Sequence, residues 1–289
     1  MCFRNTDFHQ YASNTMTIPS QKSAPVYDKR FEYLLALPLW VYLLIIVALI
    51  VSMISRLDLA TIKIAFQDKD LLNAVKLSLS TSFASTALSV LFAVPAGYAL
   101  SRARFPGAFI VDTILDIPIV LPPLVMGLSV LIFFNTPLGR FLDRGIIKEG
   151  IFIYKPLGIV LVQFIIGCAF AIRVIKSGFD SMDQHYEQIA MTLGANRWQC
   201  FFKVIIPNVI SSMIAGAVIS WARIFGLFGP ILLVAGTMRS RTEIMPTTVF
   251  LETSIGRIEV ALVVGFLMIL ISLTTLIIFK KLGGKGYLW

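Results

Sequence analysis

Residues 176–207 read KSGFDSMDQHYEQIAMTLGANRWQCFFKVIIP and form a polar connection between two long apolar runs. Ser181 is followed three residues later by Gln184, which is a capping-box pattern. We therefore expect a short helix that begins there and ends near Leu193. Gly194 is suited to end that helix, because glycine adopts the positive φ that such a stop requires.

A second amphipathic stretch follows this glycine, and we expect its large apolar side chains to share one side: Trp198, Phe201, Phe202 and Ile205. Pro207 then opens the next apolar helix, where its missing N–H costs nothing. Residues 181–207 are thus predicted to form a helix-turn-helix, here called the elbow. A projecting amphipathic elbow either lies on lipid or docks into a partner protein.

The composition identifies the surroundings of the elbow as a membrane. Hydrophobic residues make up 57% of the 289-residue chain, charged residues 14%, and the mean hydropathy is +0.84. Soluble domains carry about 25% charged residues, so an ordinary soluble enzyme and a disordered chain are both excluded. The net charge of +9 would suggest nucleic acid in a soluble protein, but here it fits cytoplasmic loops and anionic headgroups.

Six charge-poor segments are candidate membrane-spanning helices, each close to the roughly 20 residues that a bilayer requires. They are residues 33–55, 77–101, 117–139, 156–172, 204–238 and 260–279. The fourth is expected to extend through Arg173, whose long side chain can snorkel. The fifth is interrupted only by Arg223. The predicted class is therefore an all-α integral membrane protein with six transmembrane helices.

Basic residues at helix ends predict the orientation. Lys29-Arg30, Arg102 with Arg104, Arg173 with Lys176, and Lys280-Lys281 all lie inside if both termini are cytoplasmic. The first apolar run is too long for a cleaved signal and starts after some 30 polar residues, so we expect a retained anchor. The three cysteines and two histidines have no disulfide or metal-ligand spacing, and no metal site, cofactor or catalytic group is expected.

Prolines and glycines gather in the third and fifth apolar segments. Broken helices at membrane depth are tolerated against protein or a water-filled cavity, so these residues indicate either a translocation path or simple packing kinks. The candidate path residues are Pro122, Pro123, Gly127, Gly226 and Gly229.

The elbow resembles the EAA motif of ABC importer permeases, which is E-A-A, three residues, Gly, nine residues and I-x-L-P. Here the frame gives Gln188-Ile189-Ala190, Gly194 and Val204-Ile205-Ile206-Pro207, with Glu187 beside the glutamine that replaces the acid. Ile117–Pro123 reads IPIVLPP, similar to the LPLVLPP segment of molybdate, tungstate and sulfate permeases. An A-R-x-x-G-E-F-G pattern of that branch survives at Arg223, Gly226, Phe228 and Gly229, with Leu227 in place of its acid.

The resemblance implies that the elbow inserts into a groove of a separate ATP-hydrolysing subunit. The residues it assigns to this coupling are Glu187, Gln188, Ala190, Gly194, Ala195, Arg197 and Pro207. It further implies two ATPase copies, an extracytoplasmic solute-binding protein, a second permease chain forming a homodimer, and an inner-membrane location in the lipid bilayer. No nucleic acid is implied, and the solute is expected to be a small oxyanion.

The predicted organisation has four parts. Residues 1–32 form a cytoplasmic segment, 33–55 an additional transmembrane helix, 72–282 the five-helix permease core with its coupling loop 181–207, and 283–289 a cytoplasmic tail. The chain lacks the G-x-x-x-x-G-K-[ST] phosphate loop, so ATP hydrolysis is assigned to the partner and not to this chain.

Arg223 is the one charge deep in a predicted span, and two interpretations of it stay open. It either adds positive potential to an anion path or pairs with a carboxylate or carbonyl for structure. Among rival functions, an ion-coupled secondary transporter would need an intramembrane acid or inverted repeats. A membrane enzyme would need clustered His, Asp or Glu, a scaffold would not need the motif spacing, and a permease for another small solute remains an alternative.

Overall fold

The computed structural model of the chain describes residues 29–102, 106–145 and 148–282. These residues form helices and connections and contain no strand, which confirms the all-α class. The expected cytoplasmic segment 1–32 lies outside the described residues except for its last four positions. The expected tail 283–289 lies wholly outside them.

Five helices are long and apolar enough to cross a bilayer, or six if the bent pair α4–α5 counts as one span. The single helices are α1 (Lys29–Ile54), α3 (Lys69–Arg102), α7 (Pro156–Ser181), α10 (Ile206–Phe225) with the segment before it, and α13 (Ile258–Leu282). This agrees with the predicted six. Several helices are longer than the apolar runs, because their terminal turns carry charged residues.

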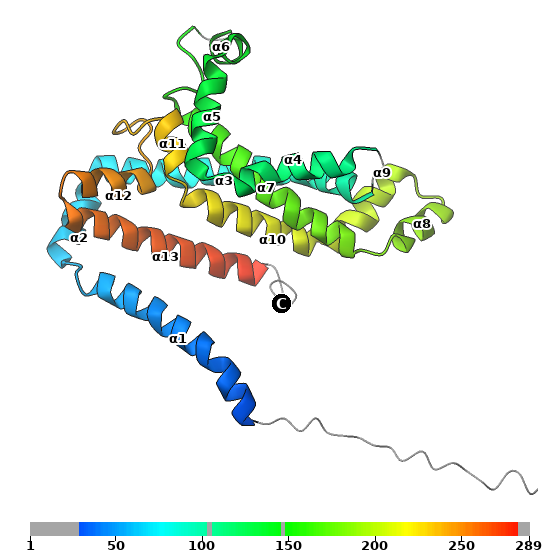
Figure 1. The fold of residues 1–289 in the computed structure, drawn as a ribbon, viewed down its shortest axis with the longest axis horizontal. Coiled ribbons are helices and arrows are strands. Elements are labelled where there is room, and N and C mark those ends of the chain that lie inside the picture. Colours follow the sequence, from blue (N-terminus) through cyan, green and yellow to red (C-terminus); the bar gives the residue numbers. More distant parts are fainter. Residues whose placement is uncertain (1–28, 103–105, 146–147, 283–289) are drawn as a thin grey trace, which may run out of the picture. The chain divides into compact units, whose positions relative to one another are not determined.

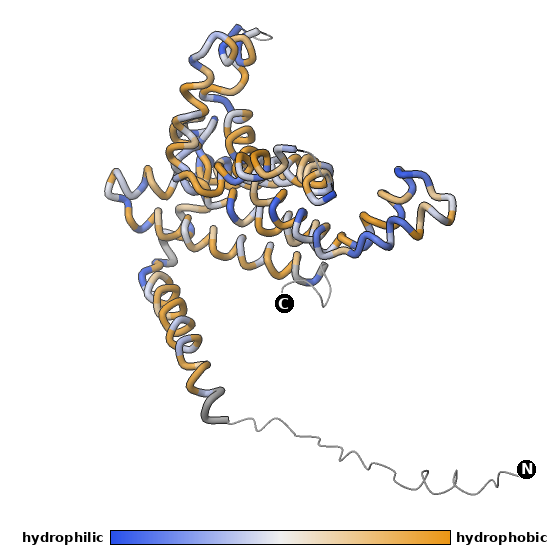
Figure 2. Tube along the Cα trace, turned by 45° about the vertical axis from the view of Figure 1, so that its right-hand side comes forward, coloured by the Kyte–Doolittle hydropathy of each residue, from blue (hydrophilic) through white to orange (hydrophobic). Residues whose placement is uncertain are grey.

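Helix α1 forms a unit separate from the rest of the chain. Its described side chains, from Tyr33 onward, are almost all exposed and apolar, and Pro38 lies within it. A helix that is apolar all round and not covered by protein is suited to contact lipid. Figure 2 shows this hydrophobic character along α1, and also along α13 of the other unit.

The core of the larger unit is the packing of α3 on α7 and α10. Small residues on α3 allow close contact, and their hydroxyls find partners across the interface, as polar groups in membrane bundles must. Ser85 Oγ lies 3.1 Å from both the carbonyl oxygen of Val160 and Oε1 of Gln163. On the α10 side, Ser220 Oγ donates to the carbonyl of Gly167 over 2.9 Å.

The third predicted span is broken, and it also begins earlier than predicted. It consists of α4 (Ala108–Val120) and α5 (Pro123–Asn135), which meet at an angle of 110°. Pro122 and Pro123 cannot donate the backbone hydrogen bonds that would continue α4, so the helix restarts there. The prediction of a start at residue 117 was wrong, because the acids before it are paired with cations of α7 and remain helical.

Besides the short helices of the elbow, the larger unit has four short helices among its described residues (Figure 1). They are α2 (Leu59–Gln67), α6 (Pro137–Arg144), α11 (Gly229–Val234) and α12 (Met245–Ser254). The predicted continuation of the fifth span to Met238 was wrong, since α10 ends at Phe225 and Gly229-Pro230 begins a new, six-residue helix.

Helix α11 packs against α5 at a close backbone contact. A Cβ added to Gly127 would lie 2.5 Å from the Cα of Pro230. No side chain fits there without moving one of the two helices. A Cβ on Gly226, by contrast, would meet nothing within 4 Å.

We therefore expect Gly127→Ala to lower the free energy of unfolding by about 1–3 kcal/mol, which is typical of overpacking. Gly226→Ala is the matched control and should have little effect. Thermal unfolding of the two purified variants in detergent measures the difference. Equal unfolding midpoints would show that α5 and α11 are not in close contact.

Candidate functional site

The elbow contains two short helices joined at a fixed angle. Helix α8 (His185–Thr192) ends in a Schellman motif, in which Ala195 N donates to Ala190 O and Gly194 N donates to Met191 O, each over 3.0 Å. Gly194 has φ +90°, as the sequence predicted. The turn angle is thus set by backbone hydrogen bonds and by a glycine that tolerates the left-handed conformation.

The predicted start of the first elbow helix was wrong. Helix α7 continues through Ser181, whose hydroxyl donates back to Gly178 O, so Ser181 does not cap a new helix. Helix α8 begins four residues later, where the Asp183 carboxylate accepts the backbone N–H of His185 over 2.9 Å. This bond and that to the His185 ring lower the pKa of Asp183.

A complete capping box lies instead at the second elbow helix, α9 (Arg197–Cys200). Asn196 Oδ1 accepts from Gln199 N over 2.8 Å, and Gln199 Oε1 accepts from Asn196 N over 3.0 Å. Both backbone donors at this helix start are satisfied by side chains. The second half of the turn is therefore as well defined as the Schellman motif before it.

Helix α9 continues into α10 through a π-helical turn, Phe201–Ile205. Pro207 has no N–H for the carbonyl of Lys203, and the wider turn accommodates its ring. Pro207 stands in the first turn of α10, as predicted, but helical structure already begins at Arg197 and continues through the π-helical turn into α10. The carbonyl of Val204 is satisfied by the side chain of Asn208 over 2.7 Å.

The four large side chains predicted to share one side of this stretch divide between two sides. Phe201 and Ile205 pack inward, whereas Trp198 and Phe202 are 74% and 61% exposed. The two exposed rings stack on each other, with centroids 6.2 Å apart. The division follows from helical spacing, since residues four apart share a face and adjacent residues do not.

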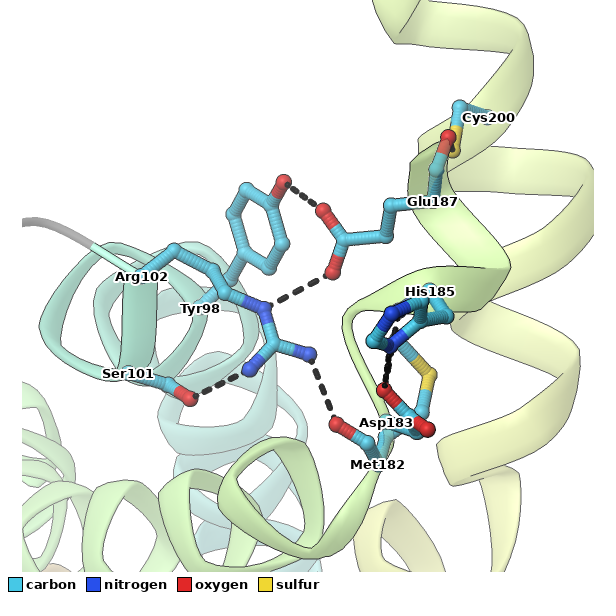
Figure 3. A network of polar contacts seen from close by, with 8 residues as sticks. All are labelled: Tyr98, Ser101, Arg102, Met182, Asp183, His185, Glu187 and Cys200. Carbon is cyan, nitrogen blue, oxygen red and sulfur yellow. Dashed lines mark hydrogen bonds and ion pairs between the residues drawn. The ribbon is translucent and has the colours of Figure 1, made fainter. Parts of the chain in front are cut away.

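An ion pair ties α8 to the end of α3 (Figure 3). Arg102 Nε lies 2.7 Å from Glu187 Oε1, and Tyr98 donates its hydroxyl to Glu187 Oε2 over 3.1 Å. Arg102 also donates to the carbonyl of Met182, where α7 turns into the elbow, over 3.2 Å. Both charged side chains are less than 15% exposed, so this contact is more sheltered than a surface ion pair.

The elbow carries exposed apolar side chains between polar ones. They are Tyr186, Ile189, Met191, Leu193, Trp198 and Phe202, and Leu193 is 83% exposed. Gln188 and Arg197 are exposed among them, while Ala190 packs against the core. Figure 2 shows hydrophobic and hydrophilic residues alternating along this hairpin. A patch of this kind on a projecting element marks an interaction surface.

A second ionic cluster holds α4 to α7 near the same end of the larger unit. Arg173 pairs with Asp116 and also with Asp112, the latter over 3.2 Å. Lys176 Nζ lies 3.2 Å from the other oxygen of Asp112. These cations were predicted only as markers of the cytoplasmic side, and their role in joining helices follows from the fold.

The candidate path residues fall in two places. Pro122 and Pro123 form the break between α4 and α5, and Gly127 meets α11 close to Gly229. Gly226 ends α10. Gly127 and Gly229 thus lie at the contact of α5 with α11, whereas Pro122 and Pro123 are exposed at the start of α5.

Arg223 lies near the end of α10, and its guanidinium stands 5.4 Å above the ring of Phe170. Its side chain is exposed, and it forms no ion pair with an Asp or Glu of the described residues. Leu227, at the position of the expected acid, is buried in the core between α5, α7 and α11. An acid there would lose its hydration without a charged partner.

Sequence reasoning missed the anchor of the elbow. Tyr98 and Arg102 are four residues apart on α3 and therefore lie on one helix face, and this spacing is visible in the sequence. Their partner Glu187 is 85 residues away from Arg102, and no local pattern links them. The burial of Glu243 and Glu252 was also not predicted, because both acids lie outside the predicted membrane-spanning segments.

These features define a class of protein: a polytopic helical membrane protein with a rigid amphipathic elbow between two of its spans. The profile of one family matches residues 89–284, and its description is "Binding-protein-dependent transport system inner membrane component". This match covers more than half of the chain, and the chain belongs to this family.

The similar proteins include permeases for oxyanions. The molybdate/tungstate transport system permease protein WtpB of Thermococcus kodakarensis is 36% identical over 168 residues, covering 58% of this chain and 62% of the relative. The same protein of Pyrococcus furiosus is matched over 66% of its length, so the chain spans less than two thirds of both archaeal relatives. The sulfate transport system permease protein CysT of Escherichia coli is 30% identical over 70% of this chain and 75% of its own.

Solved structures show the same fold at low sequence identity. A bacterial alginate ABC transporter, in complex with its alginate pentasaccharide-bound periplasmic protein, contains a chain with a TM-score of 0.73. It is 16% identical and is matched over 89% of this chain and 96% of that chain. The MetNI methionine ABC transporter gives a TM-score of 0.58 at 16% identity, over 74% and 94% of the two chains.

We expect Arg102→Gln to loosen the elbow, because the Glu187 carboxylate would lose its sheltered cation. Loss of one partner of a charged hydrogen bond costs roughly 1–3 kcal/mol, so local opening should increase by about fivefold or more. Hydrogen exchange of residues 182–200 measures this opening. Lys203→Gln removes the same charge from an exposed position of the elbow and should leave exchange unchanged; equal effects of the two variants would refute the anchor.

Proposed function

We propose that this chain is the transmembrane permease subunit of an ATP-binding-cassette importer. The observation that carries the proposal is the elbow, which is locally rigid, is anchored to α3, and presents an exposed apolar face. A loose loop could not transmit a displacement. An elbow whose turn and base are both hydrogen-bonded moves as one body with the helices that hold it.

The coupling surface is proposed to be the exposed side of α8 and α9. Gln188 and Arg197 lie on it, and Gly194 with Ala195 sets its angle. Ala190 allows close packing behind it. Glu187 takes part as the anchor and not as a partner contact, because its carboxylate is engaged by Arg102 and Tyr98. Pro207 contributes through the π-helical turn at the base of α10.

Movement of the elbow would reach the membrane-spanning helices by three routes. The Arg102–Glu187 ion pair connects the elbow to α3. The backbone connects it directly to the end of α7, and the continuous helical stretch from Arg197 connects it to α10. These are the three helices that pack into the core of the larger unit. A partner that binds one position of the elbow more tightly would thereby shift the equilibrium between two arrangements of this core.

The proposed assembly has two copies of an ATPase subunit, a second copy of this permease and an extracytoplasmic solute-binding protein. Family membership and the alginate transporter, whose complex includes a periplasmic protein, support the kinds of partner. The elbow and both termini are proposed to be cytoplasmic. The cations Arg102, Arg173 and Lys176 at the elbow end of the bundle support this orientation.

The proposed solute is a small oxyanion such as molybdate, tungstate or sulfate. The support comes from the similarity to molybdate/tungstate and sulfate permeases and from the IPIVLPP segment at the α4–α5 break. We place the path along the contact of α5 with α11, with Pro122, Pro123, Gly127 and Gly229, and next to Arg223 and Gly226 at the end of α10.

The proposal is tested by a photo-crosslinker, p-benzoylphenylalanine, placed at Leu193 on the exposed elbow. Coexpression with the ATPase subunit and irradiation should give a crosslinked product of the two chains. The same group at Ile255, which is 56% exposed next to α12, serves as the control and should give none. Absence of the product at Leu193 would overturn the assignment of the elbow.

Gly194→Val should abolish ATP-driven uptake, because a β-branched residue is strained at positive φ and would change the elbow angle. Gly256→Val is the matched control. It imposes the same strain at φ +82°, with no atom near the new Cβ in either case, but beyond α12 and away from the elbow. Solute uptake and ATPase stimulation are measured in proteoliposomes. Normal values for Gly194→Val would disprove that the elbow angle couples ATP hydrolysis to transport.

Arg223→Gln removes the positive charge of an exposed side chain whose guanidinium lies over the ring of Phe170. If Arg223 adds positive potential to an anion path, sulfate uptake should fall by about tenfold, the equivalent of 1.4 kcal/mol. Binding of the ATPase subunit should be unchanged. Unaltered uptake would instead assign Arg223 to the stacking contact with Phe170.

A further inference from the structure

A polar cavity of about 270 Å³ lies near the start of α3, whereas the elbow is anchored at the other end of that helix. One wall comes from α3 and the other from the connection between α11 and α12. The lining residues are Asn73, Lys76, Leu77, Ser80, Ser240, Arg241 and Glu243. The four from α3 follow the spacing i, i+3, i+4 and i+7, which places them on one helix face.

The connection is held against α3 by Ser240. Its hydroxyl donates to the Asp70 carboxylate, and Asn73 Nδ2 donates to the same hydroxyl oxygen over 3.5 Å. Ser240 has φ +62°, an unfavourable conformation for a residue other than glycine. Strained residues of this kind persist where the surrounding contacts hold them, and they gather at ligand sites.

Glu243 is a buried acid among the residues that line this cavity. The residue is only 4% exposed, and its Oε2 has no hydrogen-bond partner among the described residues. Desolvation raises the pKa of its carboxyl, and Asp70 and Glu252 add to this, while the Thr248 hydroxyl and Arg239 oppose it. The neutral acid carries an O–H group that can donate to a ligand.

The charges around the cavity favour an anion. Lys76 and Arg241 line it, and neither forms an ion pair with an Asp or Glu in the described part of the chain. Arg239, by contrast, is engaged by Glu252 over 2.6 Å. The lining thus carries two positive charges and several hydrogen-bond donors against the one carboxyl of Glu243, whose pKa is raised by burial, while Asp70 at the edge is bonded to Ser240.

We propose that this cavity binds a tetrahedral oxyanion of charge −2, held by Lys76 and Arg241 with a donor from Asn73 and with the buried Glu243 beside it. The inference rests on the proposed function for the class of solute and adds a site within the permease itself. A phospholipid phosphate shares this chemistry, but it carries one negative charge and a bulky glycerol. The free dianion matches the two cations and the small volume.

Equilibrium dialysis of the purified complex against [35S]sulfate tests the site, with molybdate as competitor. Lys76→Gln and Arg241→Gln should each weaken binding by about tenfold or more. Arg257→Gln is the matched control, since Arg257 is 64% exposed, lies 3.9 Å from Glu252 and does not line the cavity. Unchanged affinity in both cavity variants, or an equal loss in the control, would overturn the site.

The pH dependence tests the role of Glu243. Deprotonation adds a negative charge to the cavity, so sulfate affinity should be greatest below the raised pKa and should fall as the pH rises through it. Glu243→Gln mimics the neutral acid and should bind sulfate with an affinity that no longer falls over this range. A wild-type affinity independent of pH, or a Gln variant that keeps the same decline, would contradict the assignment.

Two further measurements separate the inference from its alternatives. Short-chain phosphatidylglycerol added to the lipid-free detergent complex should not displace sulfate; displacement at equal or lower concentration would assign the cavity to lipid headgroups. ATP-driven sulfate uptake by reconstituted complex that binds no sulfate in the cavity would overturn this inference alone. Cavity binding without any ATP-driven uptake would support the site and overturn the proposed function.

Discussion

Every other feature of this protein depends on the close packing of α3 against α7 and α10. Nothing resembling the hydrophobic effect draws apolar helices together inside lipid, so contact has to come from shape and from hydrogen bonds. Ser85 with Gln163, and Ser220 with Gly167, supply both, because small residues allow the backbones to approach while hydroxyls are satisfied across the interface. The same three helices carry the elbow at one end and, through α3, the polar cavity near the other.

The elbow gains its rigidity from several weak local devices and one distant ion pair. The Schellman motif at Gly194 and the capping box at Asn196 fix the turn, and the π-helical turn before Pro207 joins it to α10 without a break. The contact of Arg102 with Glu187 then fixes the base. Local hydrogen bonds alone would leave the hairpin free to move as a unit, whereas the ion pair, together with the packing of Phe201 against Tyr98, makes its position depend on α3.

Charged groups in the larger unit are used to join helices and not merely to mark a membrane side. Arg173 and Lys176 pair with two acids of α4, and Arg239 pairs with the buried Glu252. Lys76 and Arg241 form no such pair in the described part of the chain, and both line a polar cavity that Glu243 also lines. Cations left without carboxylates inside a polar cavity are more informative about ligands than those already engaged.

The sequence alone determined the class of the protein and the existence of the elbow, because apolar runs of bilayer length and a glycine at a helix end are local properties. It placed Gly194 correctly and predicted that the third span is broken or kinked, although only the structure located the break at Pro122 and Pro123. It failed on helix ends, since Asp112 and Asp116 remain helical once Arg173 neutralises them, and on Ser181, whose hydroxyl bonds within α7. Only the tertiary structure decided which side chains meet over long separations: Arg102 with Glu187, Gly127 with Pro230, and the residues of α3 with Ser240 and Glu243. Such pairs depend on how helices pack, and no spacing along the chain encodes that.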